Sequence, residues 1–257
     1  MPNPVLHQLN VLGSVVSSTL GKWRGSAAIK GVKQPKLPLK LYDIEASPYC
    51  RLVREALTAL HMDVEIYPCP KGGTRFRPEA ERLGGKQQFP LLIDPNTNKI
   101  MYESVHIVDY LFRTYAGRAV PKAYQRTGLT LPGVYLGTAV RGLRGQKLAP
   151  VKAVPQQMLA LWSFESSPYS RLVRERLCEL EIPYVLHNIG KERWQDIGPA
   201  VLRVKPGPYV PVPGGKREAH FTRTGHMQVP YLEDPNTGAK LLESARILDY
   251  LDDTYAR

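Results

Sequence analysis

The sequence predicts an α/β protein that contains the same small fold twice in tandem. The first observation is a repeat: residues 47–55 (SPYCRLVRE) return at 167–175 (SPYSRLVRE) with eight of nine positions identical. The second is the tetrapeptide Asp-Pro-Asn-Thr, which occurs at 94–97 and again at 234–237. The third is a shared order of short apolar runs and amphipathic stretches, β-α-β-α-β-β-α, which is typical of a mixed sheet with helices on its faces.

Each unit opens with an apolar run of strand length, and a helix follows with apolar positions at three- and four-residue spacing. A second strand, a polar and partly helical stretch, a third strand, a turn, a fourth strand and an amphipathic helix complete the unit. The turn is the Asp-Pro-Asn-Thr segment, in which Pro presets φ and Asn tolerates the left-handed region. The strands expected in unit one are 39–44, 64–67, 89–93 and 100–102, and those in unit two are 158–164, 184–186, 229–232 and 240–242.

Domain boundaries follow from the spacing of the two repeated motifs. The copies are 120 residues apart at the first motif and 140 at the second, so unit two holds twenty additional residues between them. The run 204–215 is rich in Pro and Gly, which is typical of an irregular surface loop. The segments expected are a basic leader that packs on unit one (1–38), unit one (39–116), a basic linker that serves as the leader of unit two (117–157), and unit two (158–257) with its insertion near 204–222.

The net charge of +12 is concentrated in the leader and the linker. Residues 1–42 contain six Lys and Arg and no acidic residue, and residues 110–164 contain eight and no acidic residue. An acid-free N-terminus that contains Ser is typical of organellar transit peptides. However, the dipeptide Arg-Gly at 24–25 recurs at 144–145, so we interpret the leader as a structural part of unit one.

Short amphipathic helices are expected over 5–20 in the leader and 136–143 in the linker, packed on the core. No apolar run approaches the roughly 20 residues of a membrane span, and three cysteines without paired spacing are not typical of a disulfide-stapled secreted protein. We therefore expect an intracellular protein, of the cytoplasm or of a plastid or other organelle stroma, that is neither secreted nor transmembrane. The basic segments also allow contact with an anionic membrane surface, whereas no interleaving of aromatic and basic residues indicates a specific nucleic-acid module.

Four landmarks occur in the same order in both units: a strand, Ser-Pro-Tyr at a helix start, a proline that opens a β-hairpin, and Glu-Ser before the last helix. This order resembles the thioredoxin superfamily and, more narrowly, the N-terminal domain of glutathione transferases and glutaredoxins. The resemblance covers about 40–116 and 158–256 and implies two tandem thioredoxin-like domains. The all-helical C-terminal domain of glutathione transferases is absent, and a second thioredoxin-like unit stands in its place, as in tandem glutathione S-transferase N-terminal-domain proteins.

The resemblance assigns two candidate catalytic residues. Ser47 stands where glutaredoxins have their nucleophilic cysteine and serine-type glutathione transferases their catalytic serine, and Cys50 stands at the resolving-cysteine position. A helix N-terminus favours negative charge, so Ser47 is expected to donate a hydrogen bond to the thiolate of glutathione; helix capping alone is the other interpretation. Arg51 and Arg54 place positive charge near Cys50, which favours a thiolate; an inert, half-buried thiol is the alternative.

The resemblance also implies a glutathione-binding surface in unit one. Phe89 and Pro90 correspond to the cis-proline pair whose backbone bonds to the cysteinyl residue, and Glu103 and Ser104 correspond to the pair that holds the γ-glutamyl end. An edge-strand proline and simple helix capping are the other interpretations. The equivalents in unit two are Ser167, Ser170, Val229, Pro230, Glu243 and Ser244.

The remaining cysteines receive separate interpretations. Cys69 follows the second strand, and if that strand is parallel to the first, Cys69 lies at the same sheet edge as Cys50. A Cys50–Cys69 disulfide is therefore a hypothesis, and Cys69 a candidate redox residue. Cys178 is interpreted as a buried small residue. The pairs expected on helix surfaces, four residues apart, are Arg51–Glu55 and Arg171–Glu175.

Two functions from different classes follow. The first is a glutathione-dependent enzyme of thiol–disulfide exchange, deglutathionylation or glutathione transfer, with unit one as the active unit. We favour this first function. The second is a non-catalytic tandem thioredoxin-like binding or scaffold protein, or a glutathione sensor. Glutathione is the expected co-substrate, and no metal is expected because the histidines lack ligand spacing. The second substrate, a protein or small-molecule disulfide or an electrophile, and the oligomeric state stay open.

Overall fold

The computed structural model of the chain describes residues 4–125, 130–198, 204 and 207–257. The parts outside the described residues are 1–3 of the leader, 126–129 of the linker, 199–203, and 205–206 of the predicted insertion.

Both units fold in the predicted order, and each strand lies within two residues of its expected bounds. The elements of unit one are β1 (Leu39–Asp43), α2 (Pro48–Ala59), β2 (Val64–Pro68), α3 (Phe76–Gly84), β3 (Leu91–Asp94), β4 (Lys99–Met101) and α4 (Ser104–Ala116). Those of unit two are β5 (Leu159–Ser163), α6 (Pro168–Glu179), β6 (Tyr184–Asn188), α7 (Lys216–Thr224), β7 (Tyr231–Asp234), β8 (Ala239–Leu242) and α8 (Ser244–Tyr255). The α/β class with two copies of one thioredoxin-like unit is thus confirmed.

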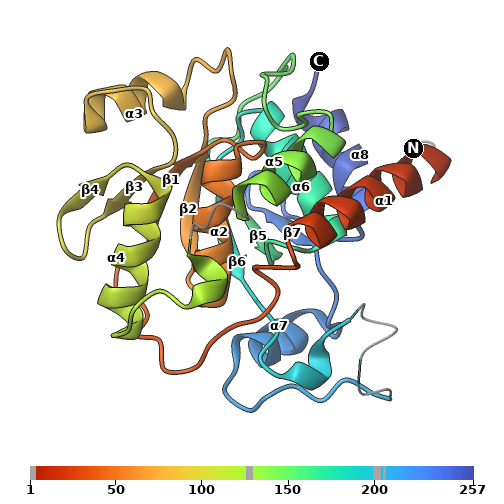
Figure 1. The fold of residues 1–257 in the computed structure, drawn as a ribbon. Helices are drawn as coiled ribbons and strands as arrows, with labels where there is room; N and C mark the ends of the chain where they lie inside the picture. Colours follow the sequence, from red (N-terminus) through yellow and green to blue (C-terminus); the bar gives the residue numbers. More distant parts are fainter. Residues whose placement is uncertain (1–3, 126–129, 199–203, 205–206) are drawn as a thin grey trace.

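The strands of the described residues form one continuous eight-stranded sheet, in the order β4-β3-β1-β2-β6-β5-β7-β8. Each unit has one parallel pair, β1 with β2 or β5 with β6, and its other pairs are antiparallel. The units join through antiparallel pairing of β2 with β6, where Val64 lies opposite Leu186 and Ile66 opposite Tyr184. Because equivalent strands lie at equal distances from this junction, the molecule has approximate twofold symmetry (Figure 1).

Different helices cover the two faces of the sheet, because successive strand residues point to opposite sides. Leu41 belongs to a large apolar core that continues through both units and includes residues of α2, α4, α6 and α8. Its neighbour Tyr42 belongs to a smaller cluster with Phe76 of α3, and Trp162 centres the equivalent cluster in unit two. α3 and α7 lie at opposite ends of the molecule (Figure 1).

The leader and the linker each contribute a helix outside the two repeated units. These elements are α1 (Pro4–Leu20) and α5 (Thr130–Val140). A short 3-10 turn at Lys122–Tyr124 precedes α5 in the linker, and a second one at Trp194–Asp196 lies in unit two. α5 begins before the expected residue 136 and ends at Val140, because Gly142 and Leu143 adopt positive φ angles of 62° and 58° that no α-helix continues. Within the described ranges, no helix combines the length and the apolar character that crossing a membrane requires.

The leader divides between the two units, and not all of it packs on unit one as predicted. α1 lies against α5 and against α6 of unit two. The segment after α1 runs along unit one, where the N–H of Ile29 bonds to the carbonyl of Ala59 at 2.8 Å. The leader and the linker each also contact the opposite unit. Ala27 of the leader forms a parallel bridge with Lys191 of unit two, and Lys147 of the linker forms the equivalent bridge with Lys71 of unit one.

The additional residues of unit two lie between β6 and α7. Seven residues separate β2 from α3 in unit one, whereas twenty-seven separate β6 from α7. Described residues 207–215 contain no helix or strand, as expected for an irregular loop. The expected insertion, near 204–222, extends too far, because α7 begins at Lys216 and is the counterpart of α3.

Candidate functional site

Ser47 begins α2 as its N-cap. Its backbone is extended, and its Oγ accepts a hydrogen bond from the N–H of Cys50 at 3.3 Å, with Pro48 as the first helical residue. Ser167 caps α6 in the same way and accepts from both the N–H of Ser170 at 3.3 Å and its hydroxyl at 2.9 Å. The capping interpretation of both serines therefore describes their geometry, because a serine at this position satisfies one unpaired helix N–H.

Cys50 is fully buried, and this burial outweighs the effect of the nearby arginines that was expected to favour its thiolate. The side chain is 0 % exposed, and its Sγ accepts the N–H of Ile44 at 3.5 Å. Burial, and next the carboxylate of Asp43, raise the pKa of Cys50 well above its usual range, and the Arg54 guanidinium only partly opposes them. Arg51 is not available to stabilise a thiolate at Cys50, since its guanidinium bonds to Glu55.

The other two cysteines are also buried, and all three are free thiols. Cys69 does follow β2 at the sheet edge of Cys50, where its N–H bonds to the carbonyl of Asp43 at 2.7 Å. The hypothesised Cys50–Cys69 disulfide is nevertheless not formed. Burial raises the pKa of Cys69 and of Cys178. Cys178 is the buried small residue that the sequence indicated, and its Sγ accepts the N–H of Glu45 at 3.5 Å.

The cis-proline expectation is confirmed in both units. The Phe89–Pro90 and Val229–Pro230 bonds are both cis. These bonds lie just before β3 and β7, at the ends of strands that border β1 and β5. The fold therefore presents the backbone of residue 89, and of residue 229, beside the strand that leads into the capped helix.

Glu103 and Glu243 hold an uncommon backbone conformation in both units. Their φ angles are 66° and 71°, in a region that residues other than glycine rarely adopt. Each carboxylate accepts a hydrogen bond from a glutamine that precedes the cis bond, Gln88 in unit one and Gln228 in unit two. Each exposed carboxylate is thereby held beside the cis-proline loop of its unit.

Ser104 opens onto a cavity in unit one. It is the first residue of α4 and is 3 % exposed. The cavity measures about 480 Å³ and lies between α2, α4 and residues 119–125, with Leu52 on α2 and Tyr124 on the far side. Its walls combine apolar residues with polar and charged ones. The apolar residues include Val105, Val108, Ala119 and Val120, and the polar ones are His106, Asp109, Arg113 and Gln125.

Ser244, the equivalent residue of unit two, is covered by α1. Its Oγ lies 3.2 Å from Nε2 of His7, which is 8 % exposed. Burial lowers the pKa of His7, although Asp249 and Glu243 oppose the shift. Sequence reasoning missed His7, because no motif surrounds it and only the placement of α1 on unit two brings it to Ser244.

A buried network of charges joins the two units directly beneath the capped helices. Arg54 contacts both oxygens of Asp43 at 2.8 and 2.6 Å and reaches Glu165 of the other unit at 3.0 Å. Arg174 contacts Glu165 at 3.0 Å and Glu45 at 3.1 Å. These five side chains are at most 3 % exposed, and their bonds run in both directions between the units.

The two ion pairs predicted on helix surfaces, Arg51–Glu55 and Arg171–Glu175, do not form as expected. Arg51 and Glu55 do form an ion pair at 3.0 Å, but both side chains are buried, so it is not a surface pair. Arg171 turns away from Glu175 and bonds to serines of α1, while Glu175 pairs with Arg141 of the linker at 2.6 Å. The physical reason is that α1 and α5 cover this face of α2 and α6 and exclude water from it.

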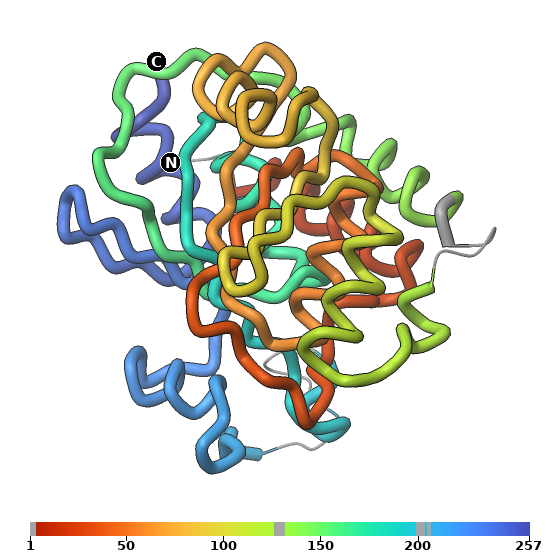
Figure 2. The backbone as a smooth tube through the Cα atoms, turned by 90° about the vertical axis from the view of Figure 1, so that its left-hand side faces the viewer, coloured from red at the N-terminus to blue at the C-terminus, as the bar shows by residue number. Residues whose placement is uncertain are grey.

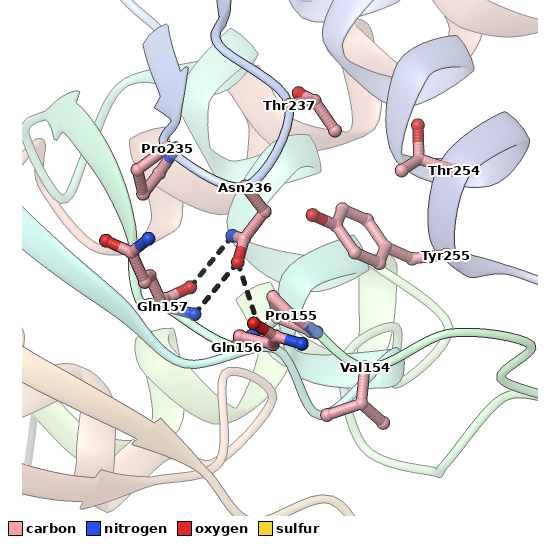
Figure 3. A pocket seen from close by; sticks show the side chains of 9 residues that line it. All are labelled: Val154, Pro155, Gln156, Gln157, Pro235, Asn236, Thr237, Thr254 and Tyr255. Atoms are coloured by element: carbon pink, nitrogen blue, oxygen red, sulfur yellow. Dashed lines mark hydrogen bonds between the residues drawn. The ribbon is translucent and has the colours of Figure 1, made fainter.

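A second cavity, of about 350 Å³, lies where the linker meets the Asp-Pro-Asn-Thr turn of unit two (Figure 3). There the side-chain oxygen of Asn236 accepts the N–H groups of Gln156 and Gln157 at 2.9 Å. Asn96 accepts the N–H of Leu37 in the same manner in unit one. None of the candidate site residues borders this cavity, so the turn serves to attach each leader. Among the described residues, no cluster of three or more His, Cys, Asp or Glu has the arrangement of a metal site.

Comparison with known families agrees with this geometry. A family model described as "Glutathione S-transferase, N-terminal domain" matches residues 41–119 and 161–257. Searches of curated proteins and of solved structures find no match. The two matched segments cover more than half of the chain, and each contains one capped helix, one cis-proline and one Glu-Ser pair. The chain therefore belongs to the glutathione S-transferase N-terminal-domain family and carries that domain twice.

Proposed function

We propose that the protein binds glutathione in unit one and acts there without a protein thiol, as a binding or transfer site. The observation that carries this proposal is the difference between the two Glu-Ser pairs. Ser104 borders a cavity of about 480 Å³, within the size range of small-molecule sites, whereas Ser244 is covered by His7.

The residues around Ser104 match the chemistry of glutathione. The γ-glutamyl end carries a carboxylate, which the first N–H groups of α4 and the Ser104 hydroxyl suit, and an ammonium group, which the Glu103 carboxylate suits. The cysteinyl part is an extended peptide that would pair with the backbone of Phe89 next to its cis bond. Its thiolate would lie at the N-terminus of α2, where the helix dipole favours negative charge and Ser47 has its hydroxyl.

The burial of Cys50 favours a non-redox form of this function. Thiol–disulfide exchange requires an accessible thiolate, and Cys50 is 0 % exposed with a raised pKa. The apolar part of the cavity beside Ser104, formed by Leu52, Val105 and Val108, instead favours a site that holds glutathione next to an apolar electrophile, or that senses glutathione alone. A non-catalytic scaffold is the second candidate, supported by the engagement of both capping serines with their own helices.

Calorimetric titration with glutathione tests the proposal, and the repeat supplies a matched control. We expect heat of binding for the wild type, and we expect Glu103→Gln to weaken binding roughly tenfold by removing one charge-assisted hydrogen bond. Glu243→Gln, an equally exposed change at the equivalent position, should leave binding unchanged. Absence of heat at millimolar glutathione, or equal losses in the two variants, would contradict binding in unit one. Adding an aryl halide then separates transfer, which forms a thioether, from binding alone.

A further inference from the structure

The outermost layer of the molecule consists of two helices, α1 and α5, which we call the α1–α5 layer. The two helices run antiparallel: a Cβ added at Gly133, near the start of α5, would approach the carbonyl oxygen of Leu20 at the end of α1 within 2.5 Å. At the other end, Arg141 donates to the carbonyl of Asn10 at 2.7 Å. Both helices lie on the same outer side of the molecule, α1 in red and α5 in green (Figures 1 and 2).

The inner face of α1 is polar, which is the reverse of an ordinary surface helix. The buried residues of this helix include Ser14, Ser17 and Ser18. Their hydroxyls accept hydrogen bonds at 3.1 Å from the buried guanidinium groups of Arg171 and Arg51. The contact of α1 with the protein is therefore made mainly by small polar groups and two arginines, with His7 and Val11 as its other buried residues, and its leucines are not among them.

The outer face of the α1–α5 layer is apolar. On α1 the side chains of Leu9 and Leu12 are 58 % and 59 % exposed, and those of Leu6 and Val16 extend the same stripe. On α5, Leu136 is 56 % exposed, and Val140 lies one turn further along. Exposed apolar side chains gathered on two adjacent helices mark a surface that another apolar phase covers.

Each end of the layer carries a bulky apolar residue beside a cation. Trp23 follows exposed Lys22 after α1, and Leu143 precedes exposed Arg144 after α5. Residues 4–24 and 130–144 contain no acidic residue. Glu55 and Glu175, which contact this region, are buried and paired with arginines of the leader and the linker, whereas Asp249 and Glu243 of unit two face His7 near the start of α1. The exposed charged residues of the layer itself, Lys22 and Arg144, are both cations.

We propose that the α1–α5 layer docks onto the surface of an anionic lipid membrane, with both helices lying in the plane of the interface. Helices with one apolar face, bordered by Lys, Arg and Trp, bind membranes in this orientation without crossing them. A second copy of the chain is the other occupant that an apolar face admits, but it would bring two positive layers together. Anionic lipid instead satisfies both the leucines and the cations. This inference does not depend on glutathione binding.

Sedimentation with lipid vesicles tests the inference on the full-length protein. We expect it to sediment with vesicles of equal parts phosphatidylcholine and phosphatidylserine, less with phosphatidylcholine alone, and less as salt concentration rises. In a Trp194→Phe background, emission should shift to shorter wavelength with the mixed vesicles, because Trp23 is 41 % exposed and Trp162 is buried.

Matched variants separate the layer from the rest of the surface. Leu9→Ser with Leu12→Ser should lower partitioning roughly tenfold, since each loses the transfer of an exposed leucine into lipid. The control is Ile100→Ser with Val154→Ser, which alters two exposed apolar residues outside the layer and should change nothing. Lys22→Glu with Arg144→Glu should lower partitioning by a similar factor, whereas Lys99→Glu with Lys240→Glu, at the two edge strands of the sheet, should have little effect.

Two results would overturn the inference. One is equal sedimentation of the wild type and the Leu9→Ser, Leu12→Ser variant, with circular dichroism showing both folded. The other is a wild-type dimer in analytical ultracentrifugation that this variant dissociates, without sedimentation of either protein with vesicles. The second result would identify another copy of the chain as the occupant.

Discussion

At the scale of single residues, the one difference between the two nine-residue motifs does not create a reactive group. Cys50 and Ser170 occupy equivalent positions, both are fully buried, and both interact with the capping serine of their helix. The motif alone could suggest a reactive thiol, because a helix N-terminus lowers a cysteine pKa. Burial has the opposite effect, and here it is the larger one.

The burial of the three cysteines leads to a prediction about thiol labelling. In native protein at pH 7 we expect no rapid reaction of Cys50, Cys69 or Cys178 with Ellman's reagent, and in denaturant we expect three thiols. Cys50→Ser should fold like the wild type, because unit two already carries serine at this position. A thiol that reacts quickly in the native wild type and is missing in Cys50→Ser would restore the redox interpretation.

The buried charge network determines how the stability of the protein changes at acid pH. Burial alone would raise the pKa of Glu165, but the guanidinium groups of Arg174 and Arg54 outweigh it and lower that pKa to about 2. The twofold symmetry is broken beside this carboxylate, because Asp43 has Ser163 as its counterpart. Burial, partly offset by Arg54, raises the pKa of Asp43 to about 6, so the two carboxylates affect the pH dependence in opposite directions.

We predict that Glu165→Gln destabilises the protein in a pH-dependent manner. A folded-state pKa of about 2, against an ordinary value of 4.5, means that the stabilisation is complete above pH 4.5 and is lost as the pH falls toward 2. The variant should lose about 3 kcal/mol in free energy of unfolding at pH 7, since it leaves two buried guanidinium groups short of a partner. Urea unfolding over a pH series measures the difference between the two proteins.

The control for this prediction is Asp109→Asn, which breaks the exposed Arg113–Asp109 pair on α4. That change should cost less than about 1 kcal/mol, because exposed pairs contribute little. A difference between wild type and Glu165→Gln that stays constant from pH 7 down to pH 3 would show that the lost interaction is not that of an ionised carboxylate.

At the scale of elements, the repeat made the units predictable from sequence. Each strand appears twice, so an apolar run that is ambiguous alone, such as 64–67, is supported by its copy at 184–186. The same duplication identified the cis-prolines, because Pro90 and Pro230 hold the same place in the order of landmarks. Local patterns of this kind depend on neighbouring residues only, which is why they could be read without a structure.

The contacts between units were not predictable in the same way. The spacing of leucines in α1 shows that an apolar face exists, but it does not say whether that face turns inward. The serines of α1 point inward and bond to Arg51 and Arg171. These two arginines were expected to be exposed, because each has a glutamate four residues further along its helix. The pairing of β2 with β6 could not be predicted from the sequence either, because each strand has the pattern of an ordinary strand of its own unit.

At the scale of the whole molecule, three kinds of contact make the two units one folding body. The sheet continues through β2 and β6, the apolar core continues through both units, and the charges of Arg54 and Arg174 are neutralised by carboxylates from both sides. Each unit alone would expose an unpaired strand edge and leave part of this buried charge without a partner. The two units therefore depend on each other for stability.

We accordingly predict a single cooperative unfolding transition in place of two separate ones. Differential scanning calorimetry should give a calorimetric enthalpy equal to the van't Hoff enthalpy, which is the test for two-state behaviour. Arg174→Ala, although it lies in unit two, should lower the midpoint of the whole transition, since it leaves Glu45 of unit one and Glu165 of unit two to share the single guanidinium of Arg54. Two resolved transitions, with only one of them shifted by the substitution, would mean that the junction at β2 and β6 contributes little and that the units fold independently.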